Sequence, residues 1–171
     1  MSIKLPSLKD NLIFWPIAAG GLAADLWTKN AVFNWLSERF PPVYDIIPGF
    51  FSLILAENAG AAFSLAQGRR TFLVAISIAA LVMVFYIFFT SRLKHVLYKI
   101  ALPMFVAGIC GNLYDRLYNR GFVRDFIDVY YKNWHWPTFN IADSLLCAAV
   151  GLIILAGFLT VEAEKKSKGK V

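Results

Sequence analysis

The stretch TFLVAISIAALVMVFYIFFT, Thr71–Thr90, decides the fold class. It contains no charged residue, and it is bracketed by Arg69 and Arg70 before it and by Arg92 and Lys94 after it. At a rise of about 1.5 Å per residue its 20 residues form a helix about 30 Å long, the thickness of the hydrocarbon core of a bilayer. The stretch therefore predicts a transmembrane helix.

Three further apolar stretches are long enough to cross a membrane. They cover about residues 11–31, 96–114 and 141–161. We therefore expect a mostly α membrane protein with four transmembrane helices, forming a single integral membrane domain over residues 1–171. Lys4 and Lys9 before the first stretch also suit a cleaved signal peptide, but the apolar run exceeds the about 7 to 15 residues typical of such signals.

The composition supports this class and argues against others. Apolar residues make up 58% of the chain, against about 45 to 50% in soluble domains, and charged residues only 16%. The net charge of +6 comes from cations beside apolar runs, so we expect no nucleic-acid partner. The many aromatic residues exclude a disordered chain, and two cysteines exclude a disulfide scaffold. We expect Cys110 and Cys147 to be buried small hydrophobes.

The positions of Lys and Arg predict the orientation in the membrane. Four spans place both termini on one side. The tails and the short connection near residues 91–99 hold nine Lys and Arg, against seven in the two longer connections, 32–70 and 115–140. By the positive-inside rule, the termini are expected to be cytoplasmic and the long connections extracytoplasmic.

The first long connection is too apolar to be a plain loop. Phe33, Trp35, Leu36 and Phe40 predict an amphipathic interfacial segment. Proline and glycine then separate runs rich in β-forming residues, which predict a small extracytoplasmic β-sheet. The candidate strands are residues 43–47, 50–57 and 61–65. The second long connection is rich in aromatic residues, which favour the headgroup level of the membrane.

With this topology, a set of polar residues falls at one depth near the outer surface. A carboxylate at the middle of a membrane helix costs roughly 3 kcal/mol on insertion scales, so their shared depth indicates a functional site. The set comprises Asp25, Lys29, Asn58, Asn112, Asp115, Arg116, Asp125, Asn140 and Asp143.

The pairs within helices also have a purely structural interpretation. Asp25 and Lys29 are four residues apart with the acid first, which favours a helical ion pair. Asn140 and Asp143 suit the N-cap and N3 positions at the start of a helix. On the residues alone, both interpretations stay open.

Two more groups have an equally simple alternative. Asn112 and Arg116 share a helix face and could cap the helix or reach towards the interface. Asp125 and Asp128 could form ordinary charge pairs with the neighbouring Arg120 or Arg124. These alternatives also stay open.

The remaining chemistry is that of carboxylates. The chain has no G-x-S-x-G, Walker or H-E-x-x-H motif, and His95 and His135 are expected on opposite sides of the membrane, so no zinc site is expected. Two carboxylates held close together in a partly dry site share a proton. One accepts a proton from an attacking water while the other hydrogen-bonds the carbonyl oxygen. Such a pair hydrolyses an amide without a metal or other cofactor.

Five sequence blocks resemble, in order and spacing, the motifs of bacterial lipoprotein signal peptidase, also called signal peptidase II. They are DLWTK from Asp25, ENAGAAFS from Glu57, GNLYDRL from Gly111, VRDFID from Val123 and FNIADS from Phe139. The resemblance implies an aspartic endopeptidase that removes the signal peptide from diacylglyceryl-modified prolipoproteins, cutting before the lipidated cysteine. It implies the bacterial cytoplasmic (inner) membrane as location, with the active site at the outer face. Lipidated prolipoproteins and membrane lipid are the partners it implies, for a monomer without metal or cofactor.

The same resemblance assigns roles to residues. It implies that Asp125 and Asp143 form the catalytic dyad. The residues implied to bind substrate or support the dyad are Asp25, Lys29, Asn58, Gly60, Asn112, Asp115, Arg116 and Asn140. Residues 30–56 contain no motif of the family.

Two other functions compete with this hypothesis. A metal-dependent lipid-headgroup enzyme would bind Mg²⁺ through oxygen ligands from Asp115, Asp125, Asp128 and Asp143. A transporter or lipid-binding protein would use its acids as proton relays or as structural groups. A chelator would abolish the first activity, and the second protein would never cut a lipidated precursor.

Overall fold

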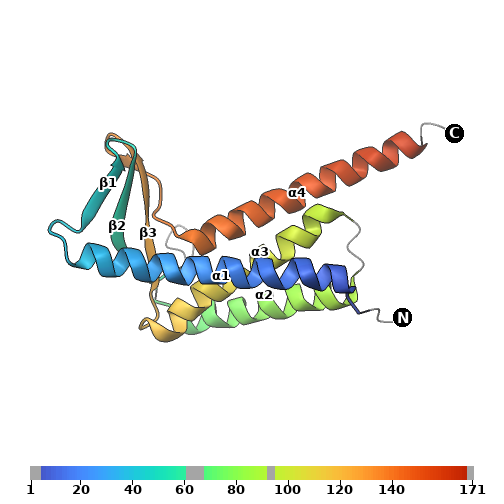
Figure 1. The fold of residues 1–171 in the computed structure, drawn as a ribbon, viewed down its shortest axis with the longest axis horizontal. Coiled ribbons are helices and arrows are strands. Elements are labelled where there is room, and N and C mark those ends of the chain that lie inside the picture. Colours follow the sequence, from blue (N-terminus) through green and yellow to red (C-terminus); the bar gives the residue numbers. More distant parts are fainter. Residues whose placement is uncertain (1–4, 61–67, 92–94, 169–171) are drawn as a thin grey trace.

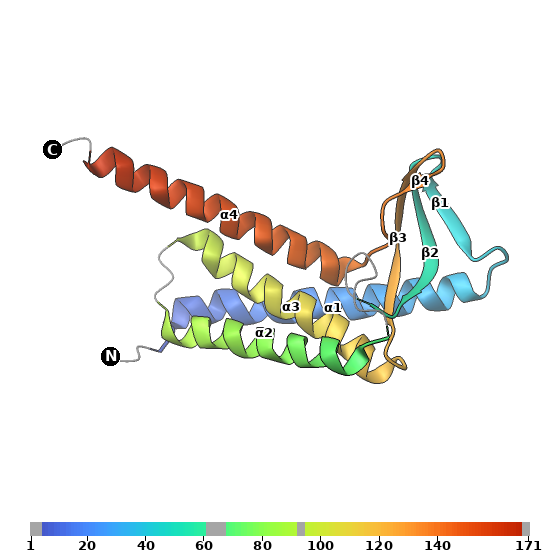
Figure 2. The same ribbon diagram turned by 180° about the vertical axis from the view of Figure 1, so that it is seen from behind.

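The computed structural model describes residues 5–60, 68–91 and 95–168. The elements in chain order are α1 (Leu8–Ser37), β1 (Val43–Ile47), β2 (Phe51–Asn58), α2 (Arg70–Thr90), α3 (Val96–Tyr118), β3 (Val123–Tyr131), β4 (Trp134–His135) and α4 (Ile141–Lys168). The helices run lengthwise and the sheet stands at one end of them (Figures 1 and 2). Helix α1 begins, and α4 ends, at the opposite end from the sheet (Figure 1).

Three helices in the described ranges are long and apolar enough to cross a membrane. They are Arg70–Thr90, Val96–Tyr118 and Ile141–Thr160. Only 11% of the most apolar stretch of Arg70–Thr90 is buried inside the protein. An exposed apolar surface of this size requires apolar surroundings, which a bilayer supplies. Three of the four expected spans are therefore confirmed as candidates.

Helix α1 forms over the fourth expected span but is not among these candidates. It contains Asp25 and Lys29 in addition to Asp10 near its start, and these polar residues interrupt its apolar sequence. Ser7 caps it in a capping box with Asp10, since each side chain accepts the other's backbone N–H.

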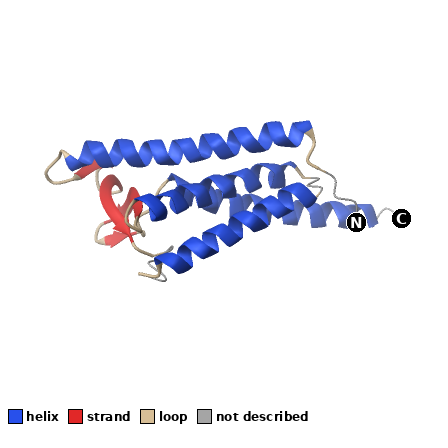
Figure 3. Cartoon of the chain, turned by 90° about the horizontal axis from the view of Figure 1, so that it is seen from below, coloured by secondary structure: helices blue, strands red, loops and turns tan. Residues whose placement is uncertain are grey.

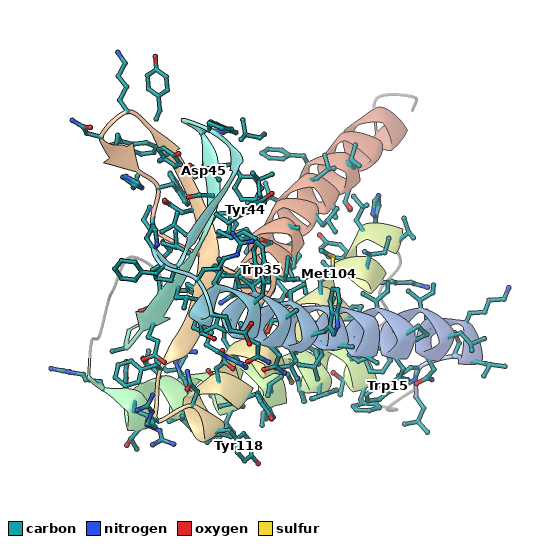
Figure 4. All side chains as sticks on the ribbon, turned by 60° about the vertical axis from the view of Figure 1, so that its left-hand side comes forward. Trp15, Trp35, Tyr44, Asp45, Met104 and Tyr118 are labelled. Atoms are coloured by element: carbon teal, nitrogen blue, oxygen red, sulfur yellow. The ribbon has the colours of Figure 1, made fainter. Side chains whose placement is uncertain are left out.

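The expected interfacial segment is the end of α1. The helix continues to Ser37, so Trp35 and Leu36 lie in its last turns rather than in a separate element. Leu36 is fully buried. The ring of Trp35 packs edge-on against Tyr44 of β1, with centroids 5.0 Å apart. Figure 4 shows these two side chains where α1 meets the sheet, with Trp15 farther along the helix.

Packing in the bundle combines aromatic and small residues. Phe14 of α1 stacks on Phe88 of α2 with centroids 3.9 Å apart, and residues of α3 complete this cluster. Glycines on α3 allow close helix contacts: a Cβ at Gly108 would collide with the carbonyl oxygen of Ala142 on α4. Small residues at such contacts are typical of helices packed within membranes.

The strands form one antiparallel sheet in the order β1-β2-β3-β4, gathered at one end of the helices in Figure 3. The predictions of strands at 43–47 and 50–57 are confirmed by β1 and β2. The candidate strand 61–65 lies outside the described residues. Strands β3 and β4 were not predicted: the connection 115–140 holds the continuation of α3 to Tyr118 and then half of the sheet.

The two cysteines differ in burial. Cys110 is half-buried, whereas Cys147 is exposed at the protein surface. The prediction that both are buried is therefore wrong for Cys147. Helix α4 leans away from the other helices towards its C-terminal end (Figures 1 and 2), and apolar side chains in this part of α4, such as Ile154 and Phe158, are exposed.

Candidate active site

Asn140 contacts both acids of the expected dyad. Asp125 lies on β3, and Asp143 lies in the first turn of α4. Asn140 Nδ2 donates to Asp125 Oδ1 over 2.7 Å. Asn140 Oδ1 accepts the backbone N–H of Asp143 at 2.9 Å, and the Asn140 N–H donates to Asp143 Oδ2 at 3.3 Å. The helix-cap interpretation of this pair is confirmed, and the same asparagine also holds Asp125.

The second oxygen of Asp125 is held from β2. Asn58 Nδ2 donates to Asp125 Oδ2 over 3.1 Å. The Gly60 N–H donates to Asn58 Oδ1 at 2.8 Å, which fixes the direction of the Asn58 amide. Both oxygens of Asp125 thus accept hydrogen bonds from neutral amides.

Asp125 occupies a dry position, with 1% of its surface exposed. Burial is the largest effect, and together with the nearby Asp143 charge it raises the pKa of Asp125 to about 7. The hydrogen bonds from Asn58 and Asn140 oppose this rise by stabilising the ionised form. A carboxyl group with this pKa holds a proton for much of the time at neutral pH.

Asp143 is held on its other side by α3. Asn112 Nδ2 donates to Asp143 Oδ1 over 2.8 Å. The oxygen of the same amide accepts from Asn140 Nδ2 at 3.1 Å and from Lys29 Nζ at 3.0 Å. The three side chains therefore link α1, α3 and α4 around the dyad.

A buried ion cluster lies behind these amides. Lys29 Nζ is 2.8 Å from Asp25 Oδ2 and 3.3 Å from Asp115 Oδ2, and all three side chains are fully buried. Asp115 also pairs with Arg124 of β3, 2.7 Å from Oδ1 to the guanidinium. The predicted helical ion pair is confirmed, but it belongs to a cluster that joins three elements.

Asp25 also caps a helix far away in the sequence. Its Oδ1 accepts the backbone N–H of Ala142 at 2.8 Å, at the start of α4. An acid at a helix N-terminus satisfies an otherwise unpaired donor and complements the helix dipole. Gly111 makes room for this contact, because a Cβ there would collide with Asp25 Oδ2.

Arg116 is buried beside the dyad rather than extended to the interface. It donates to the carbonyl oxygens of Gly60 at 2.8 Å and of Asn112 at 3.3 Å. Its Nε is buried without a hydrogen-bond partner among the described residues. Among the described residues, the Nε–H of Arg116 is therefore a hydrogen-bond donor without an acceptor.

Asp128 does not join the site. It pairs with His135 at 3.0 Å and accepts a hydrogen bond from Ser52 at 3.3 Å. Arg124 binds Asp115, so the interpretation of Asp125 and Asp128 as charge pairs with Arg124 is wrong. Within the described ranges, no group of three or more His, Cys, Asp or Glu side chains is arranged to hold a metal ion. The four acids of the competing Mg²⁺ site do not gather.

Arg124 is the supporting residue that the sequence did not single out. Its guanidinium binds Asp115, its backbone N–H donates to Asp115 Oδ2 at 3.0 Å, and its carbonyl accepts from Asn140 at 3.3 Å. Its position next to Asp125 in the block VRDFID could have indicated a supporting role. Successive side chains of a strand point to opposite faces, so Arg124 points away from Asp125 and towards Asp115.

A family model described as "Signal peptidase (SPase) II" matches residues 17–159, which include every residue of this site. The chain belongs to the signal peptidase II family. The lipoprotein signal peptidase of Serratia proteamaculans (strain 568) is 42% identical over 129 residues, 73% of this chain and 75% of the relative. That of Yersinia pestis (strain Pestoides F) is 39% identical over 133 residues, 74% of this chain and 78% of the relative. The resemblance noted in the sequence is confirmed.

Solved structures share the fold. A bacterial membrane enzyme determined by the in meso method at 2.3 Å resolution aligns with a TM-score of 0.79 and 30% identity, over 94% of both chains. A second, at 1.9 Å, aligns with a TM-score of 0.72 and 31% identity, over 91% of this chain and 97% of the other. Members of the signal peptidase II family are proteases, so this chain is a hydrolase. Its three long apolar helices fit a membrane enzyme.

Proposed function

We propose that the chain is an aspartic endopeptidase that removes the signal peptide from diacylglyceryl-modified prolipoproteins, cutting before the lipidated cysteine. Membership of the signal peptidase II family makes it a protease that processes prolipoproteins. The observation that carries the aspartic mechanism is the bridge made by Asn140 between Asp125 and Asp143. Neither acid forms an ion pair with a cation in the part of the chain that the structure describes.

The proposed reaction uses one shared proton. The ionised acid takes a proton from water, and the hydroxide equivalent attacks the carbonyl carbon of the scissile amide. The protonated acid hydrogen-bonds the carbonyl oxygen as negative charge develops on it. Cleavage of the C–N bond then releases the amine, which receives a proton from the acid that accepted it. The raised pKa of Asp125 supports a neutral acid in the pair at physiological pH.

The amides and Arg116 supply groups for an extended substrate backbone. A peptide in this conformation presents unpaired N–H and C=O groups, and asparagine both donates and accepts. The guanidinium of Arg116 also remains a hydrogen-bond donor at all relevant pH values. We assign Asp25, Lys29 and Asp115 to holding the helices and the sheet together. Lys29 pairs with both acids, Asp115 also pairs with Arg124 of β3, and Asp25 caps the start of α4.

The site lies at the sheet end of the bundle, where α4 starts and α3 ends (Figure 2). If the helices span the membrane, this end is at an interface. The scissile amide of a prolipoprotein also lies there, between a buried signal helix and a lipid anchor that begins at the headgroups. The diacylglyceryl chains would stay in lipid while the amide reaches the dyad.

We further propose the membrane arrangement. Helix α1 serves as a fourth span, so both termini face the cytoplasm and the sheet lies at the outer face of the bacterial inner membrane. The greater number of Lys and Arg near the termini supports this orientation. The chain acts as a single-domain monomer in contact with membrane lipid.

The test is cleavage of a synthetic diacylglyceryl prolipoprotein peptide by the purified chain in detergent or lipid mesophase. Mass spectrometry should find one cut, immediately before the modified cysteine, with and without excess EDTA. A peptide whose cysteine lacks the diacylglyceryl group is the matched control, and it should be cut far more slowly. Loss of activity in EDTA would favour the metal-dependent alternative, and an intact lipidated peptide would contradict the proposal.

A further inference from the structure

Lys29 is a fully buried cation whose three nearest partners come from two helices. Its Nζ lies 2.8 Å from Asp25 Oδ2, 3.3 Å from Asp115 Oδ2 and 3.0 Å from Asn112 Oδ1. Lys29 and Arg124 together balance the charges of Asp25 and Asp115. The contact with Asn112 needs a different explanation, because an amide contributes no charge.

That contact fixes which way the Asn112 amide faces. An ammonium group has three donors and no acceptor, so only the oxygen of the amide can face it. The amide nitrogen must then point the other way, where it donates to Asp143 Oδ1 over 2.8 Å. If the amide turned by half a rotation, its oxygen would face the Asp143 carboxyl group and its NH₂ would face the ammonium.

The other two amides at the dyad are fixed by backbone groups. The Gly60 N–H donates to Asn58 Oδ1, and the Asp143 N–H donates to Asn140 Oδ1. No backbone N–H donates to the oxygen of Asn112 in the described ranges. Its oxygen accepts from side chains, Lys29 Nζ and Asn140 Nδ2.

We propose that Lys29 is a positioning residue that acts on the dyad through Asn112, by keeping the amide nitrogen directed at Asp143. The proposal rests on the proposed function, since it assigns Asp143 to the dyad. It makes the lysine more than a partner for buried acids. The hydrogen bond that it maintains stabilises negative charge on the acid pair, which the pair needs in order to accept a proton from water.

A double-mutant cycle separates this role from a structural one. Lys29→Met and Asn112→Leu are made singly and together in an Asp25→Asn background, which avoids leaving Asp25 as a buried acid without its cation. Asp115 keeps Arg124 in every variant. Each variant is assayed for kcat/KM on the lipidated peptide over a range of pH, and for thermal unfolding. The matched control is the double variant Asp10→Asn, Lys99→Met, which removes an ion pair of 2.7 Å between α1 and α3.

If Lys29 acts through Asn112, each substitution lowers kcat/KM by about tenfold or more, as expected for loss of a hydrogen bond to a charged group. The two together lower it no further than the more severe one. Both move the acid limb of the pH profile to higher pH, whereas the Asp10, Lys99 control leaves that limb in place. Arg116 is the same in every variant, as are Asp115 and Arg124 behind the dyad. The charge of Lys29, which lowers the pKa of Asp125, is lost in Lys29→Met and kept in Asn112→Leu, so a shift shared by both variants reports the hydrogen bond rather than that charge.

The proposal would be overturned if the losses of kcat/KM in the two single variants multiplied in the double variant. It would also be overturned if Lys29→Met left both the acid limb of the pH profile and the unfolding temperature unchanged. Either result would assign Lys29 to charge balance alone. These outcomes are distinct from failure of the proposed function, in which the unsubstituted chain itself does not cut the lipidated peptide.

Discussion

Asn140 Nδ2 lies 2.7 Å from Asp125 Oδ1, and this hydrogen bond joins the start of helix α4 to the first residues of strand β3. The amide oxygen of Asn140 meanwhile accepts the N–H of Asp143. One side chain therefore sets the position of one acid while capping the helix that carries the other. The stability of α4 and the geometry of the dyad depend on the same residue.

Asn140→Ala is expected to lower both stability and activity. Loss of the N-cap costs about 1 kcal/mol of stability, and loss of the donor to Asp125 frees that carboxyl group to move. We expect kcat/KM to fall by at least about a hundredfold, well beyond the effect of the lost cap. Asn140→Ser, which keeps a capping oxygen but cannot reach Asp125 in the same way, is the control: it should recover the unfolding temperature without recovering the rate.

The raised pKa of Asp125 predicts how stability changes with pH. The folded chain binds a proton at Asp125 up to about pH 7, whereas the unfolded chain releases it near pH 3.8. Stability from this group is therefore complete below about pH 4 and is lost as the pH rises towards 7, by a few kcal/mol at most. Thermal unfolding in detergent at pH 5 and pH 8 should show a larger drop for the unsubstituted chain than for Asp125→Asn. Equal drops would mean that Asp125 titrates normally.

Asn58→Ala should weaken catalysis without abolishing it. The hydrogen bond from Asn58 lowers the pKa of Asp125, so its removal raises that pKa further. The rate should fall by about tenfold, as for one lost hydrogen bond to an acid, and the basic limb of the pH profile should move to higher pH. A basic limb that stays in place would show that Asn58 does not act on Asp125.

Gly111→Ala tests the close approach of α1, α3 and α4. The new Cβ would collide with Asp25 Oδ2 and lie 3.2 Å from Ala142 Cβ, so we expect Asp25 to lose its contact with the start of α4. Gly151→Ala is the matched control, because nothing lies within 4 Å of its Cβ and alanine favours a helix by up to about 1 kcal/mol. The first variant should unfold at a lower temperature and lose activity. The second should keep both, and equal behaviour of the pair would contradict the packing described.

The helices were predictable from the sequence because long apolar runs leave few alternatives. Strands β1 and β2 were predictable because turn residues separate runs of β-forming residues. Strand β3 escaped prediction for a physical reason: its buried positions include Asp125 and Asp128 as well as Val123. A strand that buries acids does not show the alternation of apolar and polar residues by which strands are recognised.

The members of the site were also predictable, but not their partners. Residues such as Asp25 and Asn112 stand out as polar groups in apolar helices. Lys29 and Asn112 are 83 positions apart, and Asp25 and Ala142 are 117 positions apart. Local sequence patterns cannot predict contacts between residues so far apart in the chain. Likewise Arg124 looks like an ordinary strand cation until Asp115 is placed beside it.

The most direct test of the proposed mechanism is single-turnover cleavage of the lipidated peptide by Asp125→Asn and Asp143→Asn, each beside the unsubstituted chain. Asparagine keeps the size of the side chain, so both variants should insert and fold like the parent. We predict no detectable product from either, in the presence or absence of EDTA. Substantial cleavage by either variant would contradict the assignment of the two acids as the catalytic pair.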